Sequence, residues 1–171
     1  MTFEGGCYCG QVRYAAEDKP QLKAQCHCRE CQYISGGAPN MFMLMAPERF
    51  RYVTGTPKTF TRSDLDQPVT REFCENCGTH LTTRRPHLPL VILKVGTLDD
   101  PSLFGLPQMA IHTLDKQPFH MIPEGVPAFD ANEHSLSPSA ARKRAFHERG
   151  GSRSNAGRPS GIIWKGCLSS V

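Results

Sequence analysis

The sequence predicts a mainly β domain followed by a basic tail, and three observations support this interpretation. Residues 1–130 contain short runs of β-branched, aromatic or alternating residues, many of them separated by Gly, Pro, Asn and Asp. Prolines recur through the same region and exclude long helices. After Asp130 the composition shifts toward Ser, Ala, Gly and Arg. We therefore expect a β domain over residues 1–130 and a separate tail over residues 131–171.

Nine runs within the first 130 residues have the character of strands. One short helical turn is predicted at CRECQYI, residues 28–34, and a short helix is predicted in the tail at SPSAARKRAFHE, residues 137–148. The rest of the tail has too few apolar residues to fold and is expected to be flexible. The nine predicted strands span residues 10–17, 22–28, 40–46, 50–55, 58–63, 69–74, 79–84, 91–98 and 109–114.

The charge distribution bounds the class of protein. The net charge of +4 is unevenly spread, because residues 1–130 carry 13 Lys and Arg against 14 Asp and Glu, whereas residues 131–171 carry 7 against 2. The main body therefore gives no reason to expect nucleic-acid binding. No apolar run is long enough to span a bilayer, and the N-terminus lacks a secretory pattern. We expect a cytoplasmic protein without a membrane partner.

Cysteines are the most informative residues of this sequence. Seven of the eight fall into three tight groups, and the eighth, Cys167, stands alone in the tail. In a reducing compartment such groups indicate metal binding or catalysis before disulfides. The three groups are Cys7 with Cys9; Cys26, Cys28 and Cys31; and Cys74 with Cys77.

Two of these groups form a predicted closed zinc site. Cys7, Cys9, Cys74 and Cys77 supply four thiolates, which complete a tetrahedral shell and make the site structural. Gly78 follows the CxxC pair, where it lets the backbone curl so that its amides point toward the sulfurs. The site would join the N-terminal hairpin to the strand that ends at Phe73. The alternative is a Cys74–Cys77 disulfide with Cys7 and Cys9 free.

Cys26, Cys28 and Cys31 then remain as a set of three, the pattern of a catalytic zinc with one open position. His27 points to the opposite side of the strand and is a poor fourth ligand. His80 is a better candidate from outside the group, although a packing role in its strand is favoured. Zn²⁺ with three thiolates carries a net charge of −1, and thiols are soft ligands that suit zinc. The open position therefore suits an incoming thiol.

Two other interpretations of this triplet stay open. It could be a second structural zinc site completed by a distant histidine. It could also be a redox centre in which two of the three cysteines form a disulfide. A redox switch would require zinc-free protein with a cysteine pair that cycles reversibly.

The order CxC, CxCxxC, CxxCG resembles the glutathione-dependent formaldehyde-activating enzyme family, which includes centromere protein V. The resemblance extends beyond the cysteines and covers roughly residues 3–130. It is carried by GGCYCGQVRYAAE, CHCRECQYISGGAP, FRYVTGTPKTFTRSD, REFCENCGTHL and IHTLDKQPFHMIPEGVPAFD. The chain departs from the family in having Phe119 where a tryptophan is common, and in its basic tail.

This resemblance implies a tent-like arrangement of antiparallel sheets around two zinc sites per chain. It implies that Cys7, Cys9, Cys74 and Cys77 hold the structural zinc, and that the triplet holds the labile, catalytic-type zinc. The implied activity joins glutathione to formaldehyde, or to another small aldehyde, giving S-hydroxymethylglutathione. This is formally a carbon–sulfur lyase reaction in reverse.

A site for glutathione should offer cations or backbone amides to its two carboxylates. On this basis we expect glutathione-binding roles for a set of residues around the triplet. They are Arg62, Ser63 and Arg71, together with Arg29 and the amides of Gly36 and Gly37.

Two alternatives to an enzyme remain. One is a glutathione carrier without real catalysis, because thiols add to formaldehyde without help. The other is a two-zinc binding module whose tail, RKRAFHERGGSRS, recruits an anionic partner such as nucleic acid.

Overall fold

The computed structural model describes residues 1–130, which contain one α-helix and four 3₁₀ helices besides their strands. The predicted tail over residues 131–171, with its helix, lies outside the described residues. The helices are α1 (Arg29–Ile34), η1 (Pro47–Arg49), η2 (Val95–Thr97), η3 (Pro101–Phe104) and η4 (Thr113–Asp115). The strands are β1 (Thr2–Gly6), β2 (Arg13–Glu17), β3 (Leu22–Cys26), β4 (Asn40–Met45), β5 (Phe50–Thr54), β6 (Lys58–Thr61), β7 (Thr70–Phe73), β8 (His80–Arg85), β9 (Leu88–Lys94), β10 (Met109–Ile111) and β11 (Ala128–Phe129).

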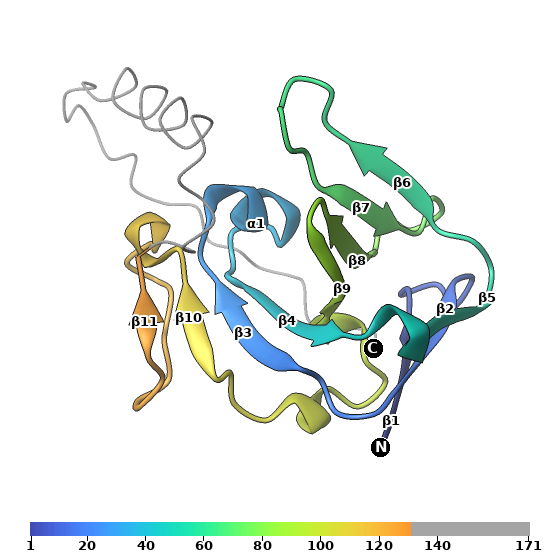
Figure 1. Ribbon diagram of the computed structural model, residues 1–171, viewed down its shortest axis with the longest axis horizontal. Coiled ribbons are helices and arrows are strands. Elements are labelled where there is room, and N and C mark those ends of the chain that lie inside the picture. Colours follow the sequence, from blue (N-terminus) through green and yellow to red (C-terminus); the bar gives the residue numbers. More distant parts are fainter. Residues whose placement is uncertain (131–171) are drawn as a thin grey trace, which may run out of the picture.

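These strands form two sheets, which confirms the prediction of a mainly β fold. The smaller sheet has the order β1-β2-β5, and the larger has the order β11-β10-β3-β4-β9-β8-β7-β6. Figure 1 shows the small sheet beside the β4–β9 part of the large one, with α1 above the ends of β3 and β4. No helix among residues 1–130 has the length and apolar character that a membrane span requires.

One edge of the large sheet adds parallel pairing to the expected antiparallel arrangement. β10 runs parallel to both β3 and β11, whereas the other pairings are antiparallel. Gln108 fixes the parallel start, because its backbone N–H donates to the Lys23 carbonyl at 2.8 Å and its side-chain oxygen accepts from the Lys23 N–H at 2.9 Å. The His27 N–H then donates to the Ile111 carbonyl at 3.0 Å.

Each of the nine predicted strands overlaps an observed strand, and the predicted helical turn over residues 28–34 is confirmed by α1. The largest difference in bounds is at β9, which begins at Leu88 and gives way to η2 after Lys94. Pro89 is tolerated because the β4–β9 ladder covers only Val91–Lys94, so β9 is unpaired on that side at Pro89.

β1 and β11 were not predicted. β1 has the sequence TFEGG, and its two glycines weaken any strand signal. Gly5 is required by a close approach, because a Cβ there would lie 2.2 Å from the Thr97 carbonyl oxygen and 2.3 Å from the Tyr14 hydroxyl. Tyr14 uses this space to place its hydroxyl 2.9 Å from the Thr97 hydroxyl. β11 is only two residues long, which is too short for a sequence pattern.

Apolar side chains form two clusters on opposite faces of the large sheet. The main core lies between the two sheets and includes Phe3 and Tyr14 from the small sheet and Met43 and Leu93 from the large one. The second cluster uses the alternate residues of β3, β4 and β9, and its buried members are Ala24, Cys26, Phe42 and Ile92.

Replacing Leu93 with Ala tests the main core. Leu93 is fully buried in β9, so the variant loses apolar contacts and leaves a cavity. We expect the free energy of unfolding, measured by urea denaturation, to fall by about 2–5 kcal/mol. Val53→Thr in β5, where the side chain is 53% exposed, should change it by less than about 0.5 kcal/mol. Equal losses in both variants would contradict this description of the core.

Candidate metal centres

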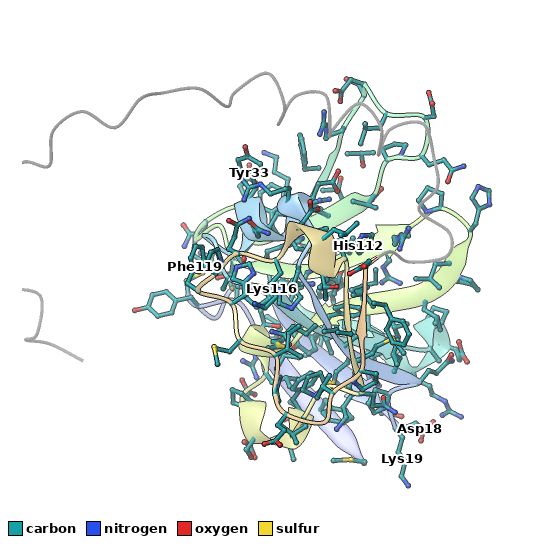
Figure 2. The ribbon with its side chains drawn as sticks, turned by 90° about the vertical axis from the view of Figure 1, so that its left-hand side faces the viewer. Asp18, Lys19, Tyr33, His112, Lys116 and Phe119 are labelled. Carbon is teal, nitrogen blue, oxygen red and sulfur yellow. The ribbon has the colours of Figure 1, made fainter. Side chains whose placement is uncertain are left out.

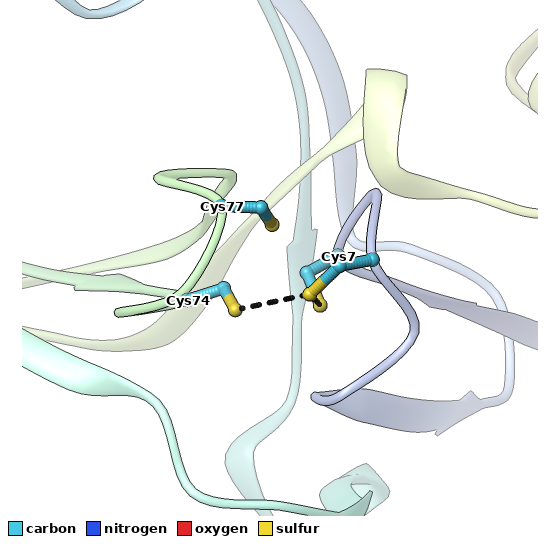
Figure 3. Close-up of side chains that lie close together, drawn as sticks. Cys7, Cys74 and Cys77 are labelled. Atoms are coloured by element: carbon cyan, nitrogen blue, oxygen red, sulfur yellow. Dashed lines mark hydrogen bonds between the residues drawn. The ribbon is translucent and has the colours of Figure 1, made fainter.

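The four-cysteine group is assembled by two turns that are distant in the sequence. Cys7 and Cys9 lie in the turn after β1, where the Cys7 N–H donates to the Val12 carbonyl at 2.9 Å. Cys74 and Cys77 lie in the turn between β7 and β8. Figure 3 shows the side chains of Cys7, Cys74 and Cys77 turned toward one another between these two turns.

The four sulfurs lie within 4.8 Å of one another, close enough to share one ion. The Sγ–Sγ distances are 3.5 Å from Cys7 to Cys9 and 3.7 Å from Cys9 to Cys74. The cysteines are free thiols, so the alternative of a Cys74–Cys77 disulfide is not formed. A hydrogen bond from the Thr79 hydroxyl lowers the pKa of Cys77 to about 5, which favours the thiolate that a metal requires.

Two backbone hydrogen bonds close the turn at Cys74. The Cys74 N–H donates to the Thr79 carbonyl at 2.9 Å, and the Gly78 N–H donates to the Cys74 carbonyl at 2.8 Å. Gly78 has a φ of +70°, in the left-handed region that residues with a Cβ occupy at a cost. The glycine therefore serves the backbone conformation, since a Cβ there would meet no other atom within 4 Å.

Replacing Gly78 with Ala separates this conformational requirement from packing. We expect the free energy of unfolding, measured by urea denaturation of the zinc-loaded protein, to fall by about 1–2 kcal/mol, because Ala is strained at this φ. Gly96→Ala is the matched control, since its Cβ would also meet nothing within 4 Å and its φ is not left-handed. An equal effect of the two substitutions would refute the requirement.

The three-cysteine group forms where β3 ends and α1 begins. Cys26 is the last residue of β3 and belongs to the second apolar cluster, against which Cys28 and Cys31 pack. Cys28 is the N-cap of α1, and its Sγ accepts a hydrogen bond from the Cys31 N–H at 3.4 Å. A strand residue, a cap and a first-turn residue thus bring three sulfurs within 4.8 Å of one another.

Among residues 1–130, no fourth His, Cys, Asp or Glu ligand atom joins this triplet. Neither His27 nor His80 is part of it, so the alternative of a distant histidine ligand finds no support among these residues. No disulfide forms within the triplet, because all three cysteines are free. The triplet therefore differs from the closed four-cysteine group in offering three protein ligands.

The three thiols of the triplet influence one another strongly. Hydrogen bonds from Cys26, and then from Cys31, lower the pKa of Cys28. Hydrogen bonds with Cys28, and then with Cys31, raise the pKa of Cys26. A thiolate at Cys28 is thus favoured at the expense of a second one nearby. Removing all three protons requires a positive charge between the sulfurs, and a metal cation supplies one.

Behind the triplet, His27 is fully buried and pairs with His120. The two Nδ1 atoms lie 3.0 Å apart, and His120 Nε2 lies 2.7 Å from the Gly37 carbonyl oxygen. The Gln117 N–H also donates to His120 Nδ1, so His120 is assigned as the Nε2–H tautomer and His27 donates from Nδ1. Burial, followed by the effect of His120, lowers the pKa of His27. His27 is therefore a neutral core histidine.

Gln32 fixes α1 against the chain that follows β10. Its side chain is buried and its Nε2 donates to two carbonyls, of His27 at 2.6 Å and of Asp115 at 2.8 Å. The Arg29 N–H adds a hydrogen bond to the Asp115 carboxylate at 3.2 Å. These contacts hold α1, and with it Cys28 and Cys31, in position.

Replacing Gln32 with Leu removes both donors from buried carbonyls. We expect the free energy of unfolding to fall by about 2 kcal/mol in urea denaturation. Tyr33→Leu is the control in the next position, because its ring is 76% exposed and contacts the Arg29 guanidinium, and it should cost less than about 1 kcal/mol. Equal stabilities of the two variants would show that Gln32 does not anchor the helix.

The structure places the predicted glutathione-binding residues unevenly. Arg71 of β7 forms a salt bridge with Glu30 of α1 at 3.1 Å, with its side chain 14% exposed. Arg29 is at the start of α1. Arg62 and Ser63 are exposed at the end of the β6–β7 hairpin, where Arg62 pairs with Asp64 at 2.5 Å.

His80 packs near the start of β8 and keeps out of both cysteine groups. Both of its ring nitrogens are buried without a hydrogen-bond partner among the described residues. Burial lowers its pKa to about 3, and the positive charges of Lys94 and Arg71 act in the same direction. His80 is therefore neutral at physiological pH.

Exposed and half-buried side chains lie around α1 and the chain that follows β10. Figure 2 shows Tyr33, Lys116, Phe119 and His112 in one region, whereas Asp18 and Lys19 lie at the opposite end. Phe119 is 70% exposed and stands edge-on to the His120 ring. Tyr33 belongs to α1, whereas His112, Lys116 and Phe119 follow β10.

Several residues of the site were missed by the sequence analysis. Lys94 had a usable signal, since it is the only charged residue in the apolar run VILKV. His120, Gln32 and Glu30 had no usable signal in the sequence, because each role depends on a distant partner. Glu30 pairs with a residue 41 positions away, Gln32 with one 83 positions away and His120 with one 93 positions away.

The fold and the two cysteine groups define a mainly β protein in which one group of four and one group of three cysteines could each hold a metal ion. Residues 2–115 match the family model described as glutathione-dependent formaldehyde-activating enzyme, and the chain belongs to this family. A crystal structure of a Rhodobacter sphaeroides protein is similar at 20% sequence identity and a TM-score of 0.48, over 60% of this chain and 94% of that one.

Proposed function

We propose that this chain is a zinc-dependent enzyme that forms and breaks the carbon–sulfur bond between glutathione, or a similar thiol, and formaldehyde or another small aldehyde. The observation that carries the proposal is the contrast between the two cysteine groups. Four sulfurs close one site, whereas three sulfurs without a fourth protein ligand among residues 1–130 form the other. The family description names glutathione and formaldehyde as the reactants.

The sulfur-only ligand sets fit zinc, and Cys26, Cys28 and Cys31 would hold the ion that matters for the reaction. Bound there, zinc would favour the thiolate form of an incoming thiol and leave it nucleophilic. Cys7, Cys9, Cys74 and Cys77 would hold a structural ion. We also propose residues 1–130 as the zinc-binding domain.

The chain's own residues would bind and orient the thiol. Arg29, at the start of α1, and Arg71, which contacts α1 through Glu30, can bind the carboxylates of glutathione. The Gly36 N–H follows α1 and can donate to a peptide carbonyl of glutathione, whereas the Gly37 N–H already donates to the Gln32 carbonyl at 2.7 Å. The sulfur then adds to the carbonyl carbon: the new carbon–sulfur bond forms as the carbonyl π bond breaks, and the proton lost from the thiol returns to the oxygen. Arg62 and Ser63, at the end of the β6–β7 hairpin, stay predicted contacts of glutathione.

Native mass spectrometry of the full chain, titrated with glutathione, tests this proposal. We expect two zinc ions per chain and one glutathione adduct. In Cys28→Ser the adduct and one zinc should be lost, while the zinc of the four-cysteine group stays. Cys167→Ser is the control, because it removes a cysteine from outside both groups and excludes a mixed disulfide at that position. Two zinc ions with no adduct would sink the glutathione proposal.

Catalysis needs its own measurement, because the reaction proceeds without an enzyme. Two-dimensional exchange NMR gives the rate of interconversion between glutathione and its hydroxymethyl adduct. We expect the wild-type chain to raise this rate well above the uncatalysed value and Cys28→Ser to lose the effect. An adduct without any rate increase would identify a glutathione carrier instead.

A further inference from the structure

Lys94 is a charged residue that the proposed reaction does not use, and it is buried. Its relative exposure is 9%, at the C-terminal end of β9 in the large sheet. A buried ammonium is costly unless an opposite charge compensates for it. Among the described residues, no carboxylate forms a salt bridge with Lys94. The compensating charge must come from another kind of group.

The sheet directs Lys94 toward the triplet. Ala24, Phe42 and Lys94 form one row across β3, β4 and β9. Cys26 is two residues beyond Ala24 on β3, and therefore on the same face. Ile92, two residues before Lys94, packs in the apolar cluster with Cys26. Neighbouring strands are about 4.8 Å apart, so β3 lies about 10 Å from β9 across β4, and an extended lysine side chain on this face covers part of that distance toward the sulfurs.

The charges around Lys94 agree with this direction. Burial lowers the pKa of Lys94 most, and the cysteines of the triplet oppose this reduction, Cys31 first, then Cys26 and Cys28. Arg71 repels it, but the Arg71 charge is already balanced by Glu30. The neighbouring His80 is neutral and adds no negative charge. The triplet is therefore the anionic group that Lys94 faces.

We propose that Lys94 is a positioning residue that balances the negative charge of the cysteine triplet and so strengthens both its hold on zinc and its acceptance of a further thiolate. Zinc with three thiolates has a net charge of −1, which the ammonium brings to zero. A fourth thiolate then leaves −1 where it would otherwise leave −2. The zinc half of this proposal stands alone, whereas the thiolate half rests on the proposed function.

Zinc retention in Lys94→Met tests the proposal without measuring activity. We expect competition with a chromophoric chelator to remove the triplet zinc at a roughly tenfold lower chelator concentration than in wild type. The zinc of the four-cysteine group should stay, which also reports that the variant is folded. Glutathione affinity, measured by calorimetry on zinc-loaded protein, should weaken by a similar factor.

Two further variants make the result specific to charge at this position. Lys94→Arg keeps the positive charge, so the chelator concentration that removes its triplet zinc should stay within about threefold of wild type. A role of the lysine in packing alone would not predict this retention. Lys58→Met removes a charge from a side chain that is 55% exposed, and should change neither zinc nor glutathione binding. Should Lys94→Met fail to fold, Lys94→Gln tests the same loss of charge.

The outcomes separate the two proposals. Wild-type zinc retention and wild-type glutathione affinity in Lys94→Met would overturn the inference. Equal zinc loss in Lys94→Met and Lys94→Arg would overturn it too, because charge would then not be the cause. Wild-type protein that binds two zinc ions but no thiol would refute the proposed function, and the zinc measurement would still decide the role of Lys94.

Discussion

The alternation of side chains along β3 is the constraint on which the site depends. Cys26 faces the outer apolar cluster, whereas Gln25 and His27 face the chain that follows β10, where Gln25 donates to the Met121 carbonyl and His27 pairs with His120. The strand is thereby held from its other face while Cys26 stays available. Because β3 ends at Cys26, Cys28 can cap α1 and bring Cys31 close to the other two sulfurs.

The two faces of the large sheet have different tasks. The face toward the small sheet is an apolar core, and it supplies the stability of the fold. The outer face carries the triplet. Both ring nitrogens of His80 and one ring nitrogen of His27 are buried without a hydrogen-bond partner among the described residues, and such unpaired polar atoms are rare in protein interiors.

The sequence predicts the parts of this structure that depend on residues close together in the chain. Alternating runs located nine strands, CRECQYI located α1, and the spacing of the cysteines separated a closed group from an open one. Parts that depend on distant partners were not predictable. Position 5 of β1 must be a glycine because Tyr14 of β2 and Thr97 of η2 approach it closely, and β10 is parallel because Gln108 meets Lys23. Lys94 likewise lies on the same face as Cys26 only because β9 pairs with β4 and β4 pairs with β3.

The four-cysteine group joins residues that are far apart in the sequence and are therefore synthesised at different times. Cys9 and Cys74 are separated by 65 positions, with six strands between them. At the roughly 5–20 residues per second of protein synthesis, the CYC pair leaves the ribosome several seconds before its partner turn exists. During that interval its two thiols lack Cys74 and Cys77, with which they share one site in the folded chain. Oxidation during biosynthesis therefore threatens this pair more than the triplet, whose three cysteines emerge almost together.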